Sequence, residues 1–253
     1  MRLRIGRRSP APTTGPAPDG APNLASVRPD ADALAWNRAR AEMVSKQLER
    51  RGLRDPRVLA AMAAVPREAF VPGVPASVAY DDRALPIDAG QTISQPYVVA
   101  RMTELLGVEP GDRILEIGTG SGYQAAVLAR LGARVTSIER HAGLAGAARE
   151  RLSALGVAGV DVRVGDGSAG VPAGAPWDGI IVTAAAPAIP ATLREQLEIG
   201  ARLVIPVGSR EQQDLRIIER ATASDWRDWS DGAVVFVPLI GEAGWAPGED
   251  TRG

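Results

Sequence analysis

The chain has 253 residues, 45% of them hydrophobic and 23% charged, which is typical of a folded protein with room for one α/β domain. Its 29 basic and 30 acidic side chains nearly cancel, so no overall charge would attract nucleic acid or an anionic membrane. Cysteine is absent, which excludes disulfides and a cysteine nucleophile. The single histidine, His141, is interpreted as a solvated residue at a helix start rather than a catalytic base.

The composition of the chain changes near residue 35. Residues 1–34 are rich in Pro, Ala and Arg and hold almost no large apolar side chains, which predicts a disordered tail before a single domain at 35–253. The pair Arg7-Arg8 lacks the apolar segment of an export signal, and no apolar run is long enough to span a membrane. We therefore expect a cytoplasmic protein that does not bind membranes.

Beyond the tail, apolar spacing and Gly or Pro signals indicate a regular order of elements. The sequence first predicts helices at 35–52 and 55–65, an ordered loop at 70–94 and a helix at 96–107. It then predicts strands at 113–117, 134–138, 160–164, 177–183, 201–207, 215–219 and 233–239, with helices at 123–131, 144–155 and 192–197. Such alternation favours an α/β fold with a doubly wound, largely parallel sheet.

A glycine-rich turn follows the first predicted strand of this sheet. Gly118, Gly120 and Gly122 alternate with Thr119 and Ser121, and such spacing lets the backbone turn tightly and approach a ligand. Ligands of doubly wound sheets bind beyond the carboxyl ends of the strands where the strand order switches, which places a site here. Tyr123 stands where the dinucleotide motif requires glycine, and no phosphate-binding lysine follows. A nucleoside without phosphates is therefore the predicted ligand.

Two carboxylates follow at the ends of the next predicted strands. Glu139 lies about 20 residues beyond the first glycine, where a carboxylate can accept hydrogen bonds from both ribose hydroxyls. Asp166 precedes Gly167 at the same edge and could accept from an adenine amino group. The alternatives are a solvated charge for Glu139 and a plain Asp-Gly turn for Asp166.

These motifs resemble those of S-adenosylmethionine-dependent methyltransferases, and the flanking segments are similar to one family in particular, the protein-L-isoaspartate O-methyltransferases. The resemblance covers about residues 35–245, and its most specific segment is GQTISQPY at 90–97. The other matching segments are VPREAFV at 65–71, ALPI at 84–87, EIGTGSGYQ at 116–124, DG at 166–167, IVTAA at 181–185 and FVPL at 236–239. Many relatives have glycine where this chain has Asp88, so the backbone there is expected to differ slightly.

The resemblance implies a Rossmann-like class I methyltransferase that uses S-adenosyl-L-methionine, with no metal site. Ser94 would be its active-site residue, although Ser94 could instead cap the helix that begins near Pro96. The residues implied for the methyl donor are Gly118, Thr119, Gly120, Ser121, Gly122, Tyr123, Glu139, Asp166 and Gly167. Those implied for the substrate are Leu85, Pro86, Ile87, Thr92, Ile93, Val237 and Pro238.

The implied reaction needs no general base, because an isoaspartyl α-carboxyl group with a pKa of about 3.5 is ionised at neutral pH. The expected partners are isoaspartyl-containing peptides and proteins, not nucleic acid or a membrane, and a monomer is expected. Two alternatives stay open. One is a small-molecule O-methyltransferase, which would share the donor residues but not the segment 91–96. The other is a non-catalytic adaptor that binds the donor.

Overall fold

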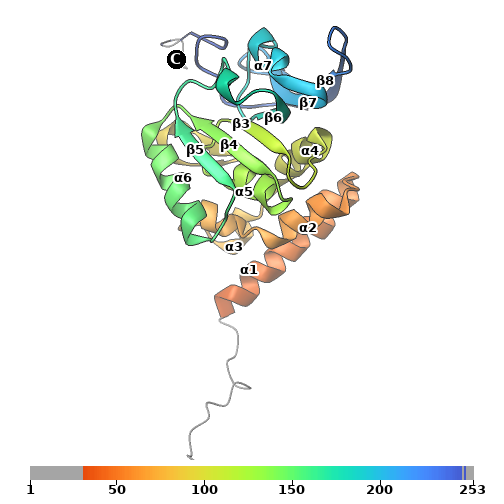
Figure 1. Ribbon diagram of the computed structural model, residues 1–253. Helices are drawn as coiled ribbons and strands as arrows, with labels where there is room; N and C mark the ends of the chain where they lie inside the picture. The colour runs from red at the N-terminus through yellow and green to blue at the C-terminus, as the bar shows by residue number, and fades with distance from the viewer. Residues whose placement is uncertain (1–30, 247, 249–253) are drawn as a thin grey trace, which may run out of the picture.

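The computed structural model describes residues 31–246 and residue 248 (Figure 1). Residues 1–30 of the predicted disordered tail lie outside the described residues. The last four residues of that predicted tail, 31–34, instead begin a helix, α1 (Ala31–Glu42). The first helix thus starts earlier than residue 35, where the apolar spacing begins.

The N-terminal helices follow the sequence prediction closely. The helix α1 continues through a π-helical turn, Met43–Leu48, and a tight turn, Glu49–Arg51, and ends at the left-handed Gly52. The next helix, α2 (Pro56–Ala64), begins at Asp55, whose carboxylate accepts the N–H of Arg57 at 2.8 Å. A proline in the first turn and an aspartate cap are the signals that predicted this start.

The loop predicted at 70–94 contains short elements of its own. It holds a helix of one turn, α3 (Ala76–Ala79), and a two-stranded ladder of β1 (Leu85–Pro86) with β2 (Thr92–Ile93). Between the two strands, the left-handed residues are Ala89, with a φ of 56°, and Gly90, with a φ of 67°, and not Asp88. The helix α4 (Pro96–Leu106) follows β2 directly and ends at Gly107.

A seven-stranded sheet in the order β5-β4-β3-β6-β7-β8-β9 forms the centre of the fold. The first five strands of that order pair in parallel and the last two pair antiparallel, which confirms the predicted doubly wound, largely parallel sheet. The strands are β3 (Arg113–Ile117), β4 (Arg134–Glu139), β5 (Val160–Val164), β6 (Trp177–Val182), β7 (Leu197–Gly208), β8 (Gln213–Arg220) and β9 (Trp226–Val234). The chain leaves β3 for β4 and β5 and returns to the other side of β3 with β6, so the strand order switches beside β3.

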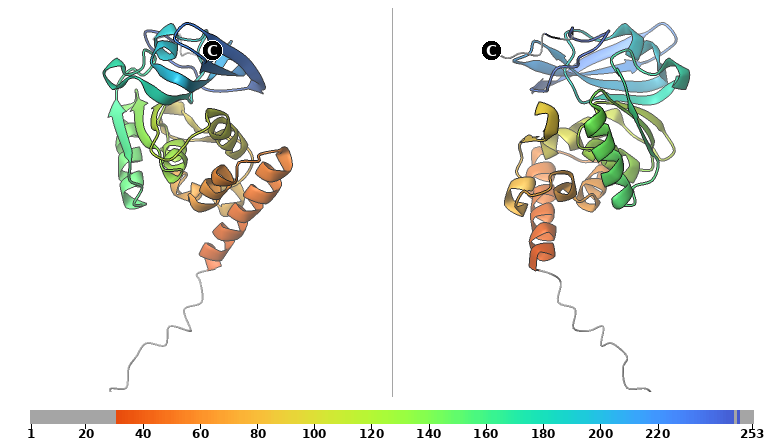
Figure 2. Two further views of the ribbon diagram at one scale, coloured as in Figure 1. Left: turned by 45° about the vertical axis from the view of Figure 1, so that its right-hand side comes forward. Right: turned by 90° about the vertical axis from the view of Figure 1, so that its left-hand side faces the viewer.

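Helices cover both faces of the sheet (Figures 1 and 2). In β3, Ile114 packs with α4 and with α5 (Tyr123–Arg130), whereas Leu115 and Ile117 pack in a separate cluster that includes Leu193 of α7 (Ala191–Glu195). The helix α6 (Ala142–Ala154) contacts β4 and β5 at one side. Because central parallel strands are buried on both faces, they appear in the sequence as nearly continuous apolar runs.

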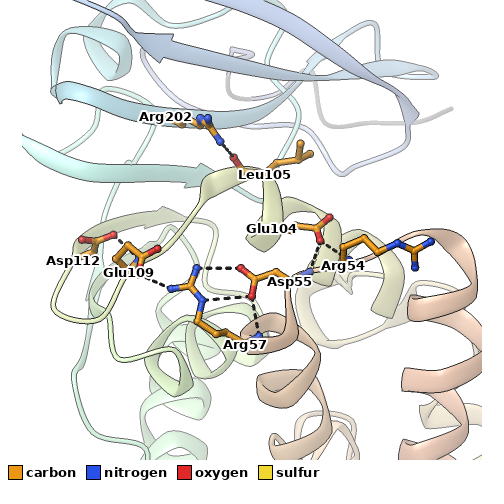
Figure 3. A network of polar contacts seen from close by, with 8 residues as sticks. All are labelled: Arg54, Asp55, Arg57, Glu104, Leu105, Glu109, Asp112 and Arg202. Carbon is orange, nitrogen blue, oxygen red and sulfur yellow. Dashed lines mark hydrogen bonds and ion pairs between the residues drawn. The ribbon is translucent and has the colours of Figure 1, made fainter.

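The helix α4 is held between the N-terminal helices and the sheet by polar contacts (Figure 3). The carboxylate of Glu104 accepts the backbone N–H groups of Arg54 and Asp55 at 2.7 and 2.9 Å. On the other side, the Arg202 guanidinium of β7 donates to the Leu105 carbonyl at 3.1 Å. These contacts fix the position of α4 and, with it, the segment 92–95 that leads into the helix.

One predicted strand is wrong. The apolar segment 233–239 was expected to form the last strand, but β9 ends at Val234 and Pro238 makes only an isolated bridge with Ala185. The last strand instead uses the polar segment that precedes it. Its residues are mostly exposed because β9 is an edge strand that pairs with β8 alone. Within the described residues, no helix has the length and apolar character needed to cross a membrane.

Candidate active site

A cavity opens at the carboxyl end of β3, where the strand order switches and where the sequence predicts the ligand site. Its empty volume is about 760 Å³, counting the space at its mouth. The wall comes from the segment after β1, the loop after β3, the end of β4, the loops after β5 and β6, and residues 237–240. Segments far apart in the sequence therefore meet around one space, of a size that suits a small ligand.

The glycine loop after β3 forms one wall of this cavity. Gly118 has a φ of 99°, and a Cβ atom there would collide with Oγ1 of Thr183. That hydroxyl donates a hydrogen bond to the Gly118 carbonyl at 2.5 Å, which ties the loop to the end of β6. Only glycine fits this position, because both the backbone angle and the neighbouring threonine exclude a side chain.

Glu139 occupies the end of β4 beside the glycine loop. Its carboxylate is buried and accepts the N–H of Gly120 at 2.9 Å on one oxygen and the N–H of His141 at 2.9 Å on the other. Each carboxylate oxygen has a second lone pair, so the group can still accept hydrogen bonds from a ligand in the cavity. The geometry thus brings Glu139 and the loop together, as the predicted ribose site requires.

A chain of buried polar groups lies beneath the loop. The hydroxyl of Ser137 donates to Glu116, and the Ser137 and Thr119 hydroxyls are 2.5 Å apart. Glu116 has no exposed surface, and its second oxygen has no hydrogen-bond partner among the described residues. Burial raises the pKa of Glu116 to about 8, with a further rise from the charge of Glu139 and an opposing effect from the Ser137 hydrogen bond. This direction of shift favours the protonated form of Glu116.

Ser94 lies in the segment between β2 and α4, in the wall of the cavity. It does not cap α4, because Asp82 accepts the N–H of Tyr97 in the first turn at 3.2 Å. Among the described residues, the Ser94 hydroxyl has no hydrogen-bond partner. Ser94 also lines a second hollow that runs away from the cavity along Val98. Its hydroxyl is thus available where the two spaces meet.

Most of the residues predicted for the site surround the cavity. Those predicted for the donor that line it are Gly118, Thr119, Gly120, Ser121, Tyr123, Glu139 and Gly167, and those predicted for the substrate are Thr92, Ile93, Val237 and Pro238. The phenol of Tyr123 points away from the space toward the N-terminal helices, where it packs edge-on against Phe70 and donates to the sulfur of Met62. Gly167 packs so closely on Ile117 that a Cβ would lie 2.8 Å from it.

Five predicted residues are not part of the cavity wall. Gly122 faces Ala148 and Leu152 of α6. Leu85 and Pro86 pair with β2, and Pro86 and Ile87 border a separate surface hollow. The carboxylate of Asp166 accepts the N–H groups of Ser168 and Glu242, each at 2.8 Å. Although burial alone would raise the pKa of Asp166, the hydrogen bonds from Glu242 and Ser168, together with the charge of Arg140, lower it below its usual range.

His141 is a cavity-lining residue that the sequence interpretation missed. It lines the cavity next to Glu139, and its Nε2 atom is buried without a hydrogen-bond partner among the described residues. The residue also stands at the start of α6, as predicted, but its side chain caps no amide there. The one signal in the sequence for a place in the cavity wall was that His141 follows Glu139, the carboxylate at the end of a strand, by two residues.

Comparisons with known proteins identify the family and support the fold. The sequence model of the protein-L-isoaspartate(D-aspartate) O-methyltransferase family matches residues 38–244. The chain belongs to this family. Proteins named protein-L-isoaspartate O-methyltransferase from Methanoculleus marisnigri and Methylorubrum populi are 56% and 55% identical, over 85% and 82% of this chain and 97% and 98% of theirs. It is therefore an S-adenosylmethionine-dependent methyltransferase, as the resemblance of its motifs implied.

Solved structures agree with this assignment. One named protein-L-isoaspartate O-methyltransferase is 29% identical with a TM-score of 0.72, and the match covers 81% of this chain and 66% of that one. A structure from Plasmodium falciparum, solved with S-adenosyl-L-homocysteine, has a TM-score of 0.68 at 24% identity and covers 79% of this chain and 98% of its own. The second match supports the fold described above for this chain.

Proposed function

We propose that this chain transfers a methyl group from S-adenosyl-L-methionine to the free carboxylate of L-isoaspartyl residues in damaged proteins and peptides, with Ser94 positioning that carboxylate. The observation that carries the proposal is the place of Ser94, which lines both the donor cavity and the hollow beside it. Its hydroxyl has no hydrogen-bond partner among the described residues. A hydroxyl at such a junction can hold a substrate oxygen against the methyl group.

The donor fits the residues around the cavity. Because Gly118 packs closely on Thr183, this position of the loop has no side chain. The amino acid portion of the donor would lie there. We assign Glu139 to the ribose hydroxyls, because its carboxylate lies within the cavity wall and has lone pairs to spare. Ile138, His141 and Gly167 line the next part of the wall and would hold the adenine.

The residues of the site act by orientation rather than by proton transfer. When bound, S-adenosylmethionine supplies a methyl group on a cationic sulfur, which keeps the electron pair of the broken carbon–sulfur bond while the carboxylate oxygen forms the ester. Ser94 donates its hydrogen bond to the other carboxylate oxygen and so directs the attacking one. Holding two reactants in line contributes up to roughly 7 to 11 kcal/mol to lowering a barrier. The fixed position of α4 maintains this geometry.

The two alternatives are less consistent with these features. A small-molecule methyltransferase would need a closed substrate pocket, whereas the hollow beside Ser94 runs along the surface past Val98 and Phe236. A non-catalytic adaptor would not require a hydroxyl without a hydrogen-bond partner beside the donor. We further propose that the protein acts in the cytoplasm as a monomer on protein and peptide substrates. We also propose that it binds neither nucleic acid nor membranes, since its acidic and basic side chains nearly balance.

The test is transfer of labelled methyl groups to a pair of peptides that differ only at one residue, L-isoaspartate or L-aspartate. We expect label in the isoaspartyl peptide alone, released as methanol after alkaline hydrolysis of the ester. Equal labelling of both peptides, or of neither, would contradict the proposed substrate. A small-molecule enzyme would label neither peptide and yet bind S-adenosylhomocysteine normally.

A further inference from the structure

The hollow beside Ser94 is a groove that continues the donor cavity across the surface. Thr92 and Ser94 line both spaces, so a substrate whose carboxylate reaches Ser94 must pass its adjoining residues along the groove. One wall comes from Asp82–Ala84 and the start of α4, and the other from the β7–β8 turn and the segment 233–236. The residues next to the isoaspartate therefore lie in this groove, an assignment that rests on the proposed function.

The walls of the groove are fixed before any substrate binds. The buried amide of Gln213 accepts the N–H of Phe236 at 2.8 Å and donates to the Ser209 carbonyl at 2.5 Å, which joins the two segments of one wall. Arg101 of α4 donates to both carboxylate oxygens of Asp231, at 2.8 and 2.5 Å, which joins that wall to the other. The shape of the groove therefore constrains which side chains fit.

The charged residues of the groove already have partners within the chain. Asp82 forms an ion pair with Arg51, Arg83 pairs with Asp81, and Glu211 accepts from the Ser209 hydroxyl. Recognition of a charged substrate residue in the groove would have to break these ion pairs and this hydrogen bond. The remaining wall is largely apolar, with Ala84, Val98, Ala233, Val234, Val235 and Phe236.

Val235 is the exposed apolar side chain of this groove, with 69% of its surface open to solvent. The other exposed large apolar residues of the described chain, such as Val164 on β5 with 49% exposed, lie outside the groove. When an apolar group of the substrate covers an exposed valine, the free energy of the complex falls because apolar surface leaves water.

We propose that the groove selects isoaspartyl sites whose neighbouring residue is apolar, and that Val235 is the specificity-determining contact for that side chain. The isoaspartyl carboxylate lies at Ser94, the backbone follows the groove, and the neighbouring side chain packs on Val235. Covering one or two methyl groups changes kcat/KM by about five- to tenfold. The chain thus repairs isoaspartate within apolar sequence contexts in preference to polar ones.

The experiment compares peptides that carry Leu or Ser immediately before or after the isoaspartate, methylated by the wild type, Val235→Ser and Val164→Ser. Val164→Ser is the matched control, because it removes an exposed valine outside the groove. In the wild type and the control, we expect Leu to exceed Ser about five- to tenfold in kcat/KM on one side of the isoaspartate. In Val235→Ser that ratio falls to about two or less, with the Ser peptide methylated as before.

Three results would overturn the proposal. A wild-type Leu-to-Ser ratio near one on both sides would show that the groove does not select apolar neighbours. An unchanged ratio in Val235→Ser, or an equal loss in Val164→Ser, would remove Val235 as the contact. In each of these cases isoaspartyl methylation persists and the proposed function stands, whereas a wild type that methylates no isoaspartyl peptide would refute both.

Discussion

Replacing Glu116 with Gln tests whether the buried carboxyl group beneath the glycine loop is protonated in the folded protein. The side chain has no exposed surface, and its hydrogen bond with Ser137 joins it to Thr119 in the cavity wall. Burial raises its pKa to about 8 from an ordinary value of 4.5. Gln has the same shape as protonated Glu and keeps an oxygen that can accept from Ser137.

The sign of the effect depends on which state holds the proton. Between pH 4.5 and about 8 the unfolded chain releases the Glu116 proton while the folded protein keeps it. The contribution of Glu116 to stability is therefore fully present below pH 4.5 and is lost as the pH rises toward 8. The slope is at most about 1.4 kcal/mol per pH unit and levels off near both pKa values, so the loss between pH 5 and pH 8 is about 3 to 4 kcal/mol. Glu116→Gln does not titrate, so it gains about this much relative to the wild type.

Urea unfolding of both proteins without ligand at several pH values measures this gain. Glu104→Gln serves as a control with the opposite sign. Although burial alone would raise the pKa of Glu104, the N–H groups of Arg54 and Asp55 and the Arg101 guanidinium lower it overall. Its contribution is present above pH 4.5 and is lost as the pH falls, so Glu104→Gln should be most harmful at neutral pH. Parallel stability profiles for wild type and Glu116→Gln from pH 5 to pH 8 would refute the reasoning.

Three further substitutions address the site. Ser94→Ala should lower kcat roughly tenfold or more, about 1.4 kcal/mol, with unchanged calorimetric affinity for S-adenosylhomocysteine; wild-type turnover would remove Ser94 from the reaction. Glu139→Gln should weaken that affinity by roughly 10- to 150-fold, because hydrogen bonds to a charged acceptor are lost, and equal affinity would exclude Glu139. His141→Ala should weaken the same affinity about fivefold while the melting temperature changes little. An effect on melting temperature alone would make His141 a structural residue.

The central strands could be predicted from the sequence because each of them carries buried apolar side chains within a short segment. The runs at 113–117, 134–138 and 177–183 match β3, β4 and β6 within one residue. Both faces of such strands are covered, so buried apolar residues mark each run even though polar residues such as Glu116 in β3 and Ser137 in β4 interrupt it. The glycine loop could be located for a similar reason, since its backbone angles require glycine whatever packs around it.

The end of the sheet could not be predicted in this way. The segment 226–234 is polar because β9 is an edge strand with little to bury, and an apolar-run criterion passes over it. The segment 235–239 is apolar for another reason, as Phe236 and Leu239 pack beneath the cavity wall rather than into a ladder. Burial and strand pairing are separate properties, and a short apolar run reports only the first.

The role proposed for Ser94 depends on a contact that local sequence does not show. A serine two residues before a helix proline could satisfy an amide of the first turn, and then it would be a structural residue. In the folded chain that amide, the N–H of Tyr97, is taken by Asp82, which lies 15 residues earlier in the sequence. Asp82 is in turn held by an ion pair with Arg51. Because a distant carboxylate caps α4, the Ser94 hydroxyl is free for the proposed contact with the substrate. Loss of Asp82 should therefore affect the position of Ser94 more than it affects donor binding.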